Sequence, residues 1–259
     1  YLLIDPDCVR VAITARTQAI VPVHLFGQTA PVEHILPIAA DAGVPIVEDA
    51  AQAQGATRHG RPAGGLGRVA ATSFYPGKNL GAAGDAGAVT TNDPEIARRV
   101  RLLAAHGSET KYVHEVVGMN SRLDTVQAVV LRAKLRRLSR WNAARCAAAE
   151  RYVDLLTDIS GVQTPVSAVG NHDAWHLFVI RIEARDELLR SLNEAGIGAG
   201  IHYPIPLHLT AAYAQLGYSR GDFPISEHAA DMILSLPLHP HISEAQQRYV
   251  ATTLQWFVE

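Results

Sequence analysis

Residues 73–90 read SFYPGKNLGAAGDAGAVT, a stretch that places one lysine, Lys78, among glycine, alanine and apolar residues. The backbone has unusual freedom there because of four glycines: Gly77, Gly81, Gly84 and Gly87. A buried strand is predicted over 71–75, so Lys78 follows a strand end, which is where open α/β sheets bind ligands. The alternative is a solvated lysine on a flexible glycine loop, since most lysines are surface charges.

Short apolar segments alternate with helical segments around this stretch. Buried strands are predicted over 19–26, 44–49, 71–75 and 87–91. One helix is predicted over 31–43, with a kink at Pro37, and another over 93–107, capped by Asp93. Such alternation is typical of a mostly parallel sheet that helices cover on both faces.

The pattern changes after Leu123. A single long helix is predicted over 124–156, with leucines on one face: Leu131, Leu135 and Leu138. A polar loop over 161–174 precedes a strand over 175–182 and three helices, over 185–196, 222–234 and 243–257. We therefore predict a large domain over 1–140, followed over 141–259 by a connecting helix and a small α+β domain.

Composition excludes several classes of function. The 259 residues carry a formal charge of −2 and only 6% aromatic residues, which argues against a nucleic-acid partner or a charged membrane surface. No apolar run is long enough to cross a bilayer. The two cysteines, Cys8 and Cys146, lie far apart without metal spacing, so a reducing cytoplasm is expected.

A second candidate site residue is Asp49, in IVEDAAQAQGA over 46–56. The strand before it is predicted to be buried, yet it ends in two carboxylates, which either cap the next element or meet a ligand. Side chains alternate along an extended chain, so Asp49 and Ala51 are expected on one side. Alanine leaves room for a flat ring beside the acid.

Together, Asp49 and Lys78 suit pyridoxal 5'-phosphate (PLP). A carboxylate can keep the pyridine nitrogen protonated, while a lysine holds the aldehyde carbon as an imine. Ser73, on the strand that enters the lysine loop, can donate a hydrogen bond to the phosphate.

Five motifs, in this order along nearly the whole chain, resemble the DegT/DnrJ/StrS family of sugar-nucleotide aminotransferases. They are VHLFG (23–27), VEDAAQAQGA (47–56), SFYPGKNLGAAGDAGAV (73–89), GMNSRLDTVQA (118–128) and HYPIPLHL (202–209). The resemblance implies a fold-type-I PLP transferase, similar to aspartate aminotransferase, that is dimeric with active sites at the subunit interface.

The resemblance also implies roles for individual residues. Lys78 matches the lysine that binds PLP covalently, Asp49 the partner of the pyridine nitrogen, Gln52 the ligand of the ring hydroxyl, and Ser73 a phosphate ligand. Asn120 matches an asparagine that reaches the phosphate of the neighbouring subunit's cofactor. The sugar nucleotide is expected near Arg122, His202 and Tyr203. For Arg122, an ion pair with Asp124 or another carboxylate is the alternative.

Family members carry a substantial portion before the segment that matches YLLID here. That portion supplies a helix start for the phosphate and an aromatic residue that stacks on the ring. Neither is found in this sequence, so we expect the N-terminal part of the large domain to be absent from this chain. A helix N-terminus is a strong phosphate site, which makes this difference important.

The expected reaction is transamination of a nucleoside-diphosphate keto-deoxysugar, with glutamate as donor and a slight preference for C3 over C4. Relatives that dehydrate their substrate have histidine in place of the lysine, whereas Lys78 is present here. One alternative is a non-catalytic regulator that binds PLP or a sugar nucleotide. Another is a lysine lyase or aldolase without PLP, but this leaves Asp49 and Gln52 unexplained.

Other motifs carry less weight. The string GGLGRVA (64–70) has dinucleotide-like spacing, but no strand precedes it, so it is interpreted as a loop. Twelve histidines raise the question of a metal, but none has ligand partners at convincing spacing. Ser73 lacks the G-x-S-x-G setting of a hydrolase nucleophile.

Overall fold

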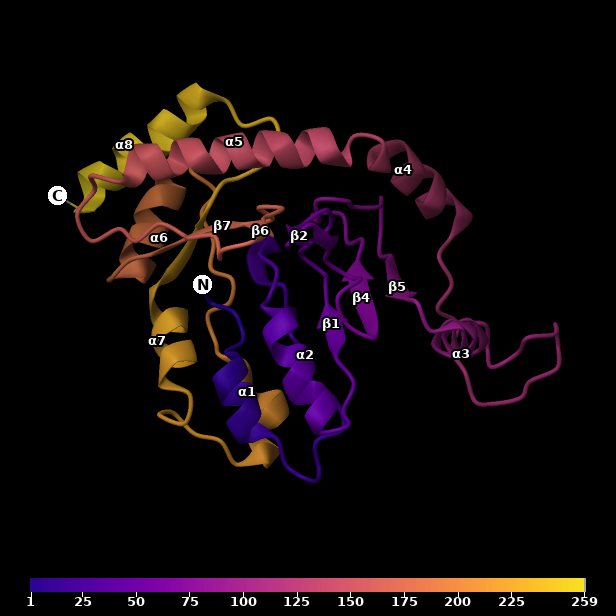
Figure 1. Ribbon diagram of the computed structural model, residues 1–259. Helices are drawn as coiled ribbons and strands as arrows, with labels where there is room; N and C mark the ends of the chain where they lie inside the picture. Colours follow the sequence, from indigo (N-terminus) through magenta and orange to yellow (C-terminus); the bar gives the residue numbers. More distant parts are fainter. Residues whose placement is uncertain (259) are drawn as a thin grey trace. The chain divides into compact units, whose positions relative to one another are not determined.

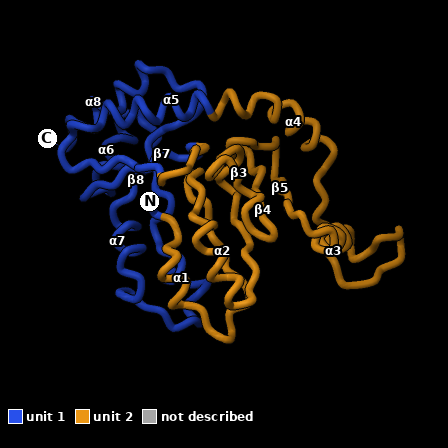
Figure 2. The backbone as a smooth tube through the Cα atoms, in the orientation of Figure 1, with its two compact units in different colours: residues 1–2, 143–167, 175–259 blue, residues 3–142, 168–174 orange. Residues whose placement is uncertain are grey.

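The computed structural model describes residues 1–258. The chain divides into two compact units (Figure 2). Unit 2 comprises Leu3–Asn142 and Ala168–Ala174, and unit 1 comprises the remaining described residues. Among residues 1–258, no helix is both long and apolar enough to cross a membrane.

The main sheet of unit 2 has three strands in the order β1 (Val47–Asp49), β4 (Val69–Ser73) and β5 (Gly87–Thr91) (Figure 1). β1 and β4 are parallel, with Asp49 opposite Ala71, whereas β5 runs antiparallel at the edge. The sheet is therefore mixed. The predicted strand over 87–91 is confirmed with those bounds, whereas the strands predicted over 44–49 and 71–75 are found with shorter or shifted bounds.

The predicted strand over 19–26 is wrong as a regular strand. Ile20 and Val23 form isolated parallel bridges to Ile46 and Asp49, and the chain then turns through η1 (Leu25–Gly27). Pro22 lies between the two bridges and has no N–H to donate, which limits the ladder.

Four helices belong wholly to unit 2: α1 (Pro6–Ala12), α2 (Val32–Asp41), α3 (Pro94–Ala104) and α4 (Thr125–Leu135). The helices predicted over 31–43 and 93–107 are confirmed. Asp93 caps α3, because its Oδ1 accepts hydrogen bonds from the N–H groups of Glu95 and Ile96. The apolar face of α2 is buried in a cluster with Val9 of α1 and with residues outside the helices, and the cluster includes Ile20, Ile35, Ile38 and Ile46.

Unit 2 also holds a small antiparallel sheet in the order β3 (Arg61–Pro62), β2 (Thr57–Arg58) and β6 (Asn171–His172). Arg58 is buried here, and its guanidinium donates to both carboxylate oxygens of Glu33. The same guanidinium donates to Asn171 Oδ1 at 2.8 Å, so this sheet tethers the segment 168–174 to unit 2.

The single helix predicted over 124–156 is wrong. The structure has α4 and then α5 (Leu138–Leu156), separated by a turn in which Arg137 N–H donates to Lys134 O. Leu131 and Leu138 are buried as expected, but Leu135 is 56% exposed because it ends α4 beside the turn.

The core of unit 1 surrounds a two-stranded antiparallel sheet, β7 (Phe178–Arg181) and β8 (Ile233–Leu236). Residues of α5, α6 (Arg185–Glu194) and α8 (Glu244–Val258) pack around it. Unit 1 also contains α7 (Pro224–Met232) and the short 3₁₀ turns η2 (Leu207–Leu209) and η3 (Ala211–Leu216). The helix predicted over 222–234 ends at Met232, because Ile233 and Leu234 pair with β7 instead.

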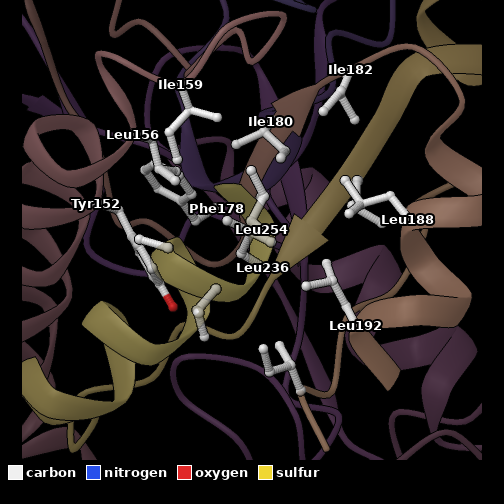
Figure 3. Packing of buried hydrophobic residues seen from close by; sticks show 14 of the residues in the cluster. Tyr152, Leu156, Ile159, Phe178, Ile180, Ile182, Leu188, Leu192, Leu236 and Leu254 are labelled. Atoms are coloured by element: carbon white, nitrogen blue, oxygen red, sulfur yellow. The ribbon is translucent and has the colours of Figure 1, made fainter. Parts of the chain in front are cut away.

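Tyr152, Phe178 and Leu254 lie fully buried together in this core (Figure 3). The rings of Tyr152 and Phe178 are 5.0 Å apart between centroids, and Tyr152 Oη donates to Pro237 O at 3.0 Å. Burial of each such side chain contributes about 2 kcal/mol to the stability of unit 1.

Candidate active site

The neighbouring parallel strands β1 and β4 bring Asp49 and the Lys78 loop to one edge of the sheet. Asp49 ends β1, and Ala50 N–H donates to Ala71 O, which continues the pairing past the strand end. The chain leaves β4 at Ser73 and turns, with Lys78 N–H donating to Tyr75 O at 2.9 Å. This is the edge at which parallel α/β sheets bind ligands.

Lys78 and Asp49 interact electrostatically. Burial lowers the pKa of the Lys78 amine below its ordinary value of 10.5, and the negative charge of Asp49 raises it, offsetting part of that shift. A half-buried amine with a lowered pKa is the form of lysine suited to nucleophilic chemistry. The amine and the carboxylate predicted from the sequence are thus brought together in unit 2.

The loop that carries Lys78 is held by α4. Lys134 Nζ donates to Gly81 O at 2.6 Å, and Ala83 N–H donates to Gln127 Oε1 at 2.8 Å. A Cβ at Gly81 would lie 2.3 Å from Pro76 O, so glycine is required for this close approach. The loop is consequently a fixed turn rather than a flexible glycine tether.

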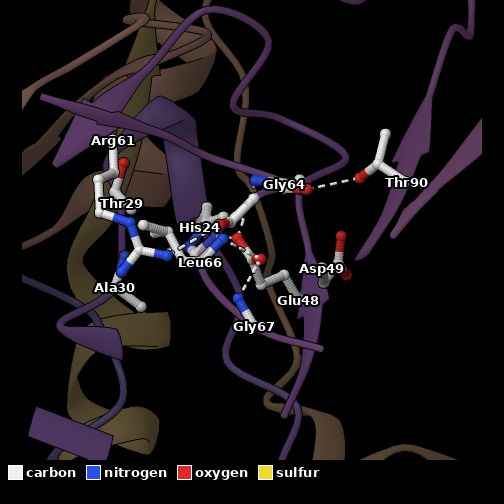
Figure 4. A network of polar contacts seen from close by, with 12 residues as sticks. His24, Thr29, Ala30, Glu48, Asp49, Arg61, Gly64, Leu66, Gly67 and Thr90 are labelled. Carbon is white, nitrogen blue, oxygen red and sulfur yellow. Dashed lines mark hydrogen bonds and ion pairs between the residues drawn. The ribbon is translucent and has the colours of Figure 1, made fainter. Parts of the chain in front are cut away.

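Glu48, the residue before Asp49, is the centre of a buried polar network (Figure 4). Its carboxylate accepts hydrogen bonds from Gly64 N–H at 2.8 Å, Leu66 N–H at 2.7 Å and Gly67 N–H at 2.6 Å. Burial raises the pKa of Glu48, but the hydrogen bonds from His24, Gly67 and Gly64 outweigh it and leave the pKa lowered.

His24 completes this network. Its Nδ1 accepts from Ala30 N–H at 3.0 Å, so that nitrogen carries no proton, and its Nε2 lies 2.8 Å from Glu48 Oε2 as the donor. The glycine-rich string over 64–70 therefore binds a carboxylate of its own chain. In Figure 4 the side chains of Glu48 and Asp49 point to opposite sides of β1, which leaves Asp49 directed away from the network.

Gln52, Ser73 and Ala51 surround the same strand ends. Gln52 is buried, and its Oε1 accepts from Phe26 N–H at 2.6 Å. Ser73 Oγ accepts from Tyr75 N–H at 3.2 Å, which leaves its hydroxyl proton available as a donor. Ala51 N–H donates to Asp49 Oδ1 at 3.0 Å, which fixes the orientation of that carboxylate.

Gln54 was not predicted as a site residue, yet its side chain links the two strand ends at this edge of the sheet. Its Nε2 donates to Ala51 O at 3.0 Å, Thr72 Oγ1 at 2.9 Å and Ser73 O at 2.7 Å. Its Oε1 is buried and has no hydrogen-bond partner among the described residues. A buried acceptor of this kind has a free-energy cost unless a donor, such as a ligand group or water, meets it.

Asn120 and Arg122 lie on the segment before α4. Arg122 Nε donates to Asn120 Oδ1 at 3.2 Å, and both side chains are exposed. Among residues 1–258, Arg122 forms no ion pair, so the alternative pairing with Asp124 is not observed. Arg122 instead lines a cavity of about 550 Å³ with Asp85, Gly87 and Ser121.

His202 and Tyr203 belong to unit 1. His202 Nδ1 lies 2.8 Å from Ser235 Oγ on β8, and Tyr203 is 54% exposed. Their rings meet edge to face, with centroids 5.7 Å apart. The prediction that they contact the sugar nucleotide remains a prediction.

Comparison of this chain with solved structures identifies its class of protein. S. venezuelae DesV in complex with a ketimine intermediate matches with a TM-score of 0.96 and 47% identity, over 99% of this chain and 69% of that chain. The fold is that of the fold-type-I PLP aminotransferases, as predicted from the sequence. The chain belongs to the DegT/DnrJ/EryC1/StrS aminotransferase family, whose profile matches residues 1–255.

Two characterised relatives bear different names. The erythromycin biosynthesis sensory transduction protein EryC1 of Saccharopolyspora erythraea is 51% identical over 97% of this chain and 69% of its own length. The dTDP-3-amino-3,4,6-trideoxy-alpha-D-glucose transaminase of Streptomyces venezuelae is 47% identical over 98% of this chain and 67% of its own length. This chain thus spans about two thirds of the length of either protein.

PLP is the cofactor of this family, and a solved relative carries its amino form, pyridoxamine phosphate. The described residues of unit 2 fit this group. A half-buried amine with a lowered pKa, a carboxylate within electrostatic reach and the unpartnered buried Gln54 Oε1 lie at one edge of the sheet. No described group of three His, Cys, Asp or Glu side chains offers a metal site there or elsewhere.

Proposed function

We propose that the protein transfers an amino group, with glutamate as the donor, to C3 of a nucleoside-diphosphate keto-deoxysugar. The observation that carries the proposal is the Lys78 amine, whose pKa is lowered by burial and partly restored by Asp49. The preference for C3 draws on the S. venezuelae relative, which is named for a 3-amino sugar.

In this proposal, Lys78 would hold PLP at its aldehyde carbon, Asp49 at its ring nitrogen, Gln52 at its ring hydroxyl and Ser73 at its phosphate. When bound, PLP supplies a carbonyl that accepts the amino group and a ring that withdraws electrons from the reacting carbon. The Asp49 carboxylate, oriented by Ala51 N–H, keeps the ring nitrogen protonated.

Once the incoming amino group has replaced it on PLP, the freed Lys78 Nζ would act as general base and acid. Its lowered pKa gives a larger fraction of neutral amine near pH 7 than an ordinary lysine has, so Nζ can remove a proton and return it. General acid–base catalysis of this kind contributes about 10²–10⁴-fold to the rate. Arg122, beside a cavity of about 550 Å³, would bind the anionic diphosphate of the substrate.

The proposed regiochemistry is tested with a panel of 3-keto and 4-keto nucleotide sugars, each supplied with glutamate or another amino acid. We expect amination of a 3-keto sugar with glutamate, identified by product mass and NMR. Amination of 4-keto sugars alone would overturn the C3 assignment, and turnover only with another amino acid would overturn the donor.

We further propose a homodimer in which Asn120 of one subunit serves the cofactor of the other. Lys78→Ala and Asn120→Ala proteins would each be inactive alone, but a mixed dimer would regain about half of wild-type turnover, because one of its two sites is intact. Absence of recovery in a confirmed mixed dimer would place Asn120 in its own subunit's site.

We propose a cytoplasmic location, because the sequence has only two cysteines, Cys8 and Cys146, and they lie far apart along the chain. A second candidate function is a non-catalytic regulator, favoured by the name of the S. erythraea relative. An absorption spectrum separates the two functions: an enzyme's PLP band shifts when glutamate is added, whereas a regulator's band does not.

A further inference from the structure

Three buried amide side chains connect the two segments that carry Asp49 and Lys78. Asn79, which follows Lys78 directly, is 6% exposed, and its Nδ2 donates to Asn142 Oδ1 at 3.0 Å. Asn142 is equally buried, and its Nδ2 donates to Gln54 O at 2.8 Å. We call Asn79, Asn142 and Gln54 the amide chain.

The amide chain closes on the strand ends. The side chain of Gln54 donates to Ser73 O and Ala51 O, the residues that flank the proposed cofactor site on β4 and after β1. Asn79 Nδ2 also donates to Ala174 O at 2.7 Å, so the lysine loop has two buried anchors at one residue. Hydrogen bonds of the amide chain therefore link the segment that carries Asp49 to the segment that carries Lys78.

Gly55 makes room for this arrangement. A Cβ at Gly55 would lie 2.5 Å from Asn142 Nδ2, and the residue has φ of +86°, which other residues rarely adopt. Asn142 lies in the first turns of α5, at positions 63 and 88 residues from its two partners in the sequence. Asn142 on α5 therefore places an amide that both donates and accepts in the space that Gly55 leaves open.

We propose that Asn79, Asn142 and Gln54 are positioning residues that set the separation of the Lys78 amine and the Asp49 carboxylate. An asparagine is suited to this role because its amide accepts from one segment and donates to the other. The amide of Asn142 is buried and engaged at both its oxygen and its nitrogen, so it has few alternative arrangements, which makes the link rigid. This inference rests on the proposed function, since PLP is the group that must fit between the amine and the carboxylate.

The test uses the full-length protein with Asn142→Ala, Asn79→Ala, the double variant and Asn92→Ala, an exposed asparagine of unit 2, as the matched control. PLP affinity is measured by titration of its absorption band, and the pH midpoint of that band is measured for bound protein. Thermal unfolding without PLP reports on stability alone.

We expect Asn142→Ala and Asn79→Ala each to weaken PLP binding about tenfold and to shift the pH midpoint. The double variant should lose less affinity than the product of the two single losses, because both side chains belong to one chain of hydrogen bonds. Asn92→Ala should match wild type. Wild-type affinity and midpoint in either folded single variant would overturn the inference, even if its unfolding temperature falls.

If Asn142→Ala does not fold, Asn79→Ala decides the question, because it keeps Asn142 and its bond to Gln54. Failure of the proposed function is distinguishable from failure of this inference: in the former case the wild-type protein itself forms no PLP absorption band.

Discussion

The carboxylate of Asp49 raises the pKa of the Lys78 amine, while burial of that amine lowers it more strongly. The two effects act on one nitrogen at the ends of neighbouring parallel strands. A solvated surface lysine would experience neither, so the pair has the properties of a reactive site.

Replacement of Lys78 with alanine is expected to abolish turnover and the covalent capture of PLP. The chain has only three lysines, at 78, 111 and 134, so borohydride reduction followed by peptide mass mapping identifies the modified residue unambiguously. Lys111→Ala, which alters an exposed lysine, should retain the modification and the activity. Persistent PLP capture in Lys78→Ala would refute the assignment.

Asp49→Asn should move the titration of Lys78 to lower pH. Asp49 raises the pKa of Lys78, so removal of the charge leaves burial unopposed and the neutral amine dominates at a lower pH. The measurement is the pH dependence of Lys78 acylation in PLP-free protein, with Asp41→Asn as the exposed control. A midpoint that rises or stays in place contradicts the electrostatic link. Turnover should fall about 100-fold or more.

Glu48→Gln should destabilise the protein by about 3 kcal/mol, because a neutral amide cannot satisfy the donors of Gly64, Leu66, Gly67 and His24. The folded-state pKa of Glu48 is below its ordinary value of 4.5, so the carboxylate stabilises the fold fully above that pH. This contribution is lost as the pH falls through the folded-state pKa.

Urea unfolding at a series of pH values tests both statements about Glu48. The difference in unfolding free energy between wild type and Glu48→Gln should shrink as the pH drops below 4.5. Glu115→Gln, an exposed substitution, should follow wild type throughout. A difference that is constant with pH would show that the altered shape of the side chain at position 48, and not the loss of its charge, destabilises the protein.

Arg122→Ala should raise KM for the nucleotide sugar about tenfold with little change in the half-reaction with the amino donor. The reason is that its guanidinium lines a cavity and has no carboxylate partner among the described residues. Arg99→Ala, an exposed change on α3, serves as control. An equal effect on both half-reactions would indicate a role in cofactor binding instead.

Local signals in the sequence predicted the parts of the fold that depend on neighbours along the chain. Asp93 before Pro94 predicted the start of α3, and the strands predicted over 44–49 and 71–75 placed the candidate site at one sheet edge. The turn at Arg136 and Arg137 carried no such signal, because arginine is a good helix former. Ile233 and Leu234 continue a helical pattern, and only their pairing with β7 makes them a strand.

The supporting residues of the site were not predictable because their partners are distant in sequence. Nothing near Asn142 indicates that its amide meets Asn79 and Gln54, 63 and 88 residues away. Glu48 could be recognised as a carboxylate at a strand end, but its backbone donors come from a loop 16 to 19 residues later and its side-chain donor, His24, lies 24 residues earlier.

That loop has a practical consequence for ligand binding. The backbone N–H groups of Gly64, Leu66 and Gly67 converge on one anion in the way that nests capture phosphate or sulfate in other proteins, and here that anion is the Glu48 carboxylate. Sulfate added to the protein should therefore not bind at this glycine-rich turn. A phosphate monoester offered to the protein must find its donors in another part of the molecule.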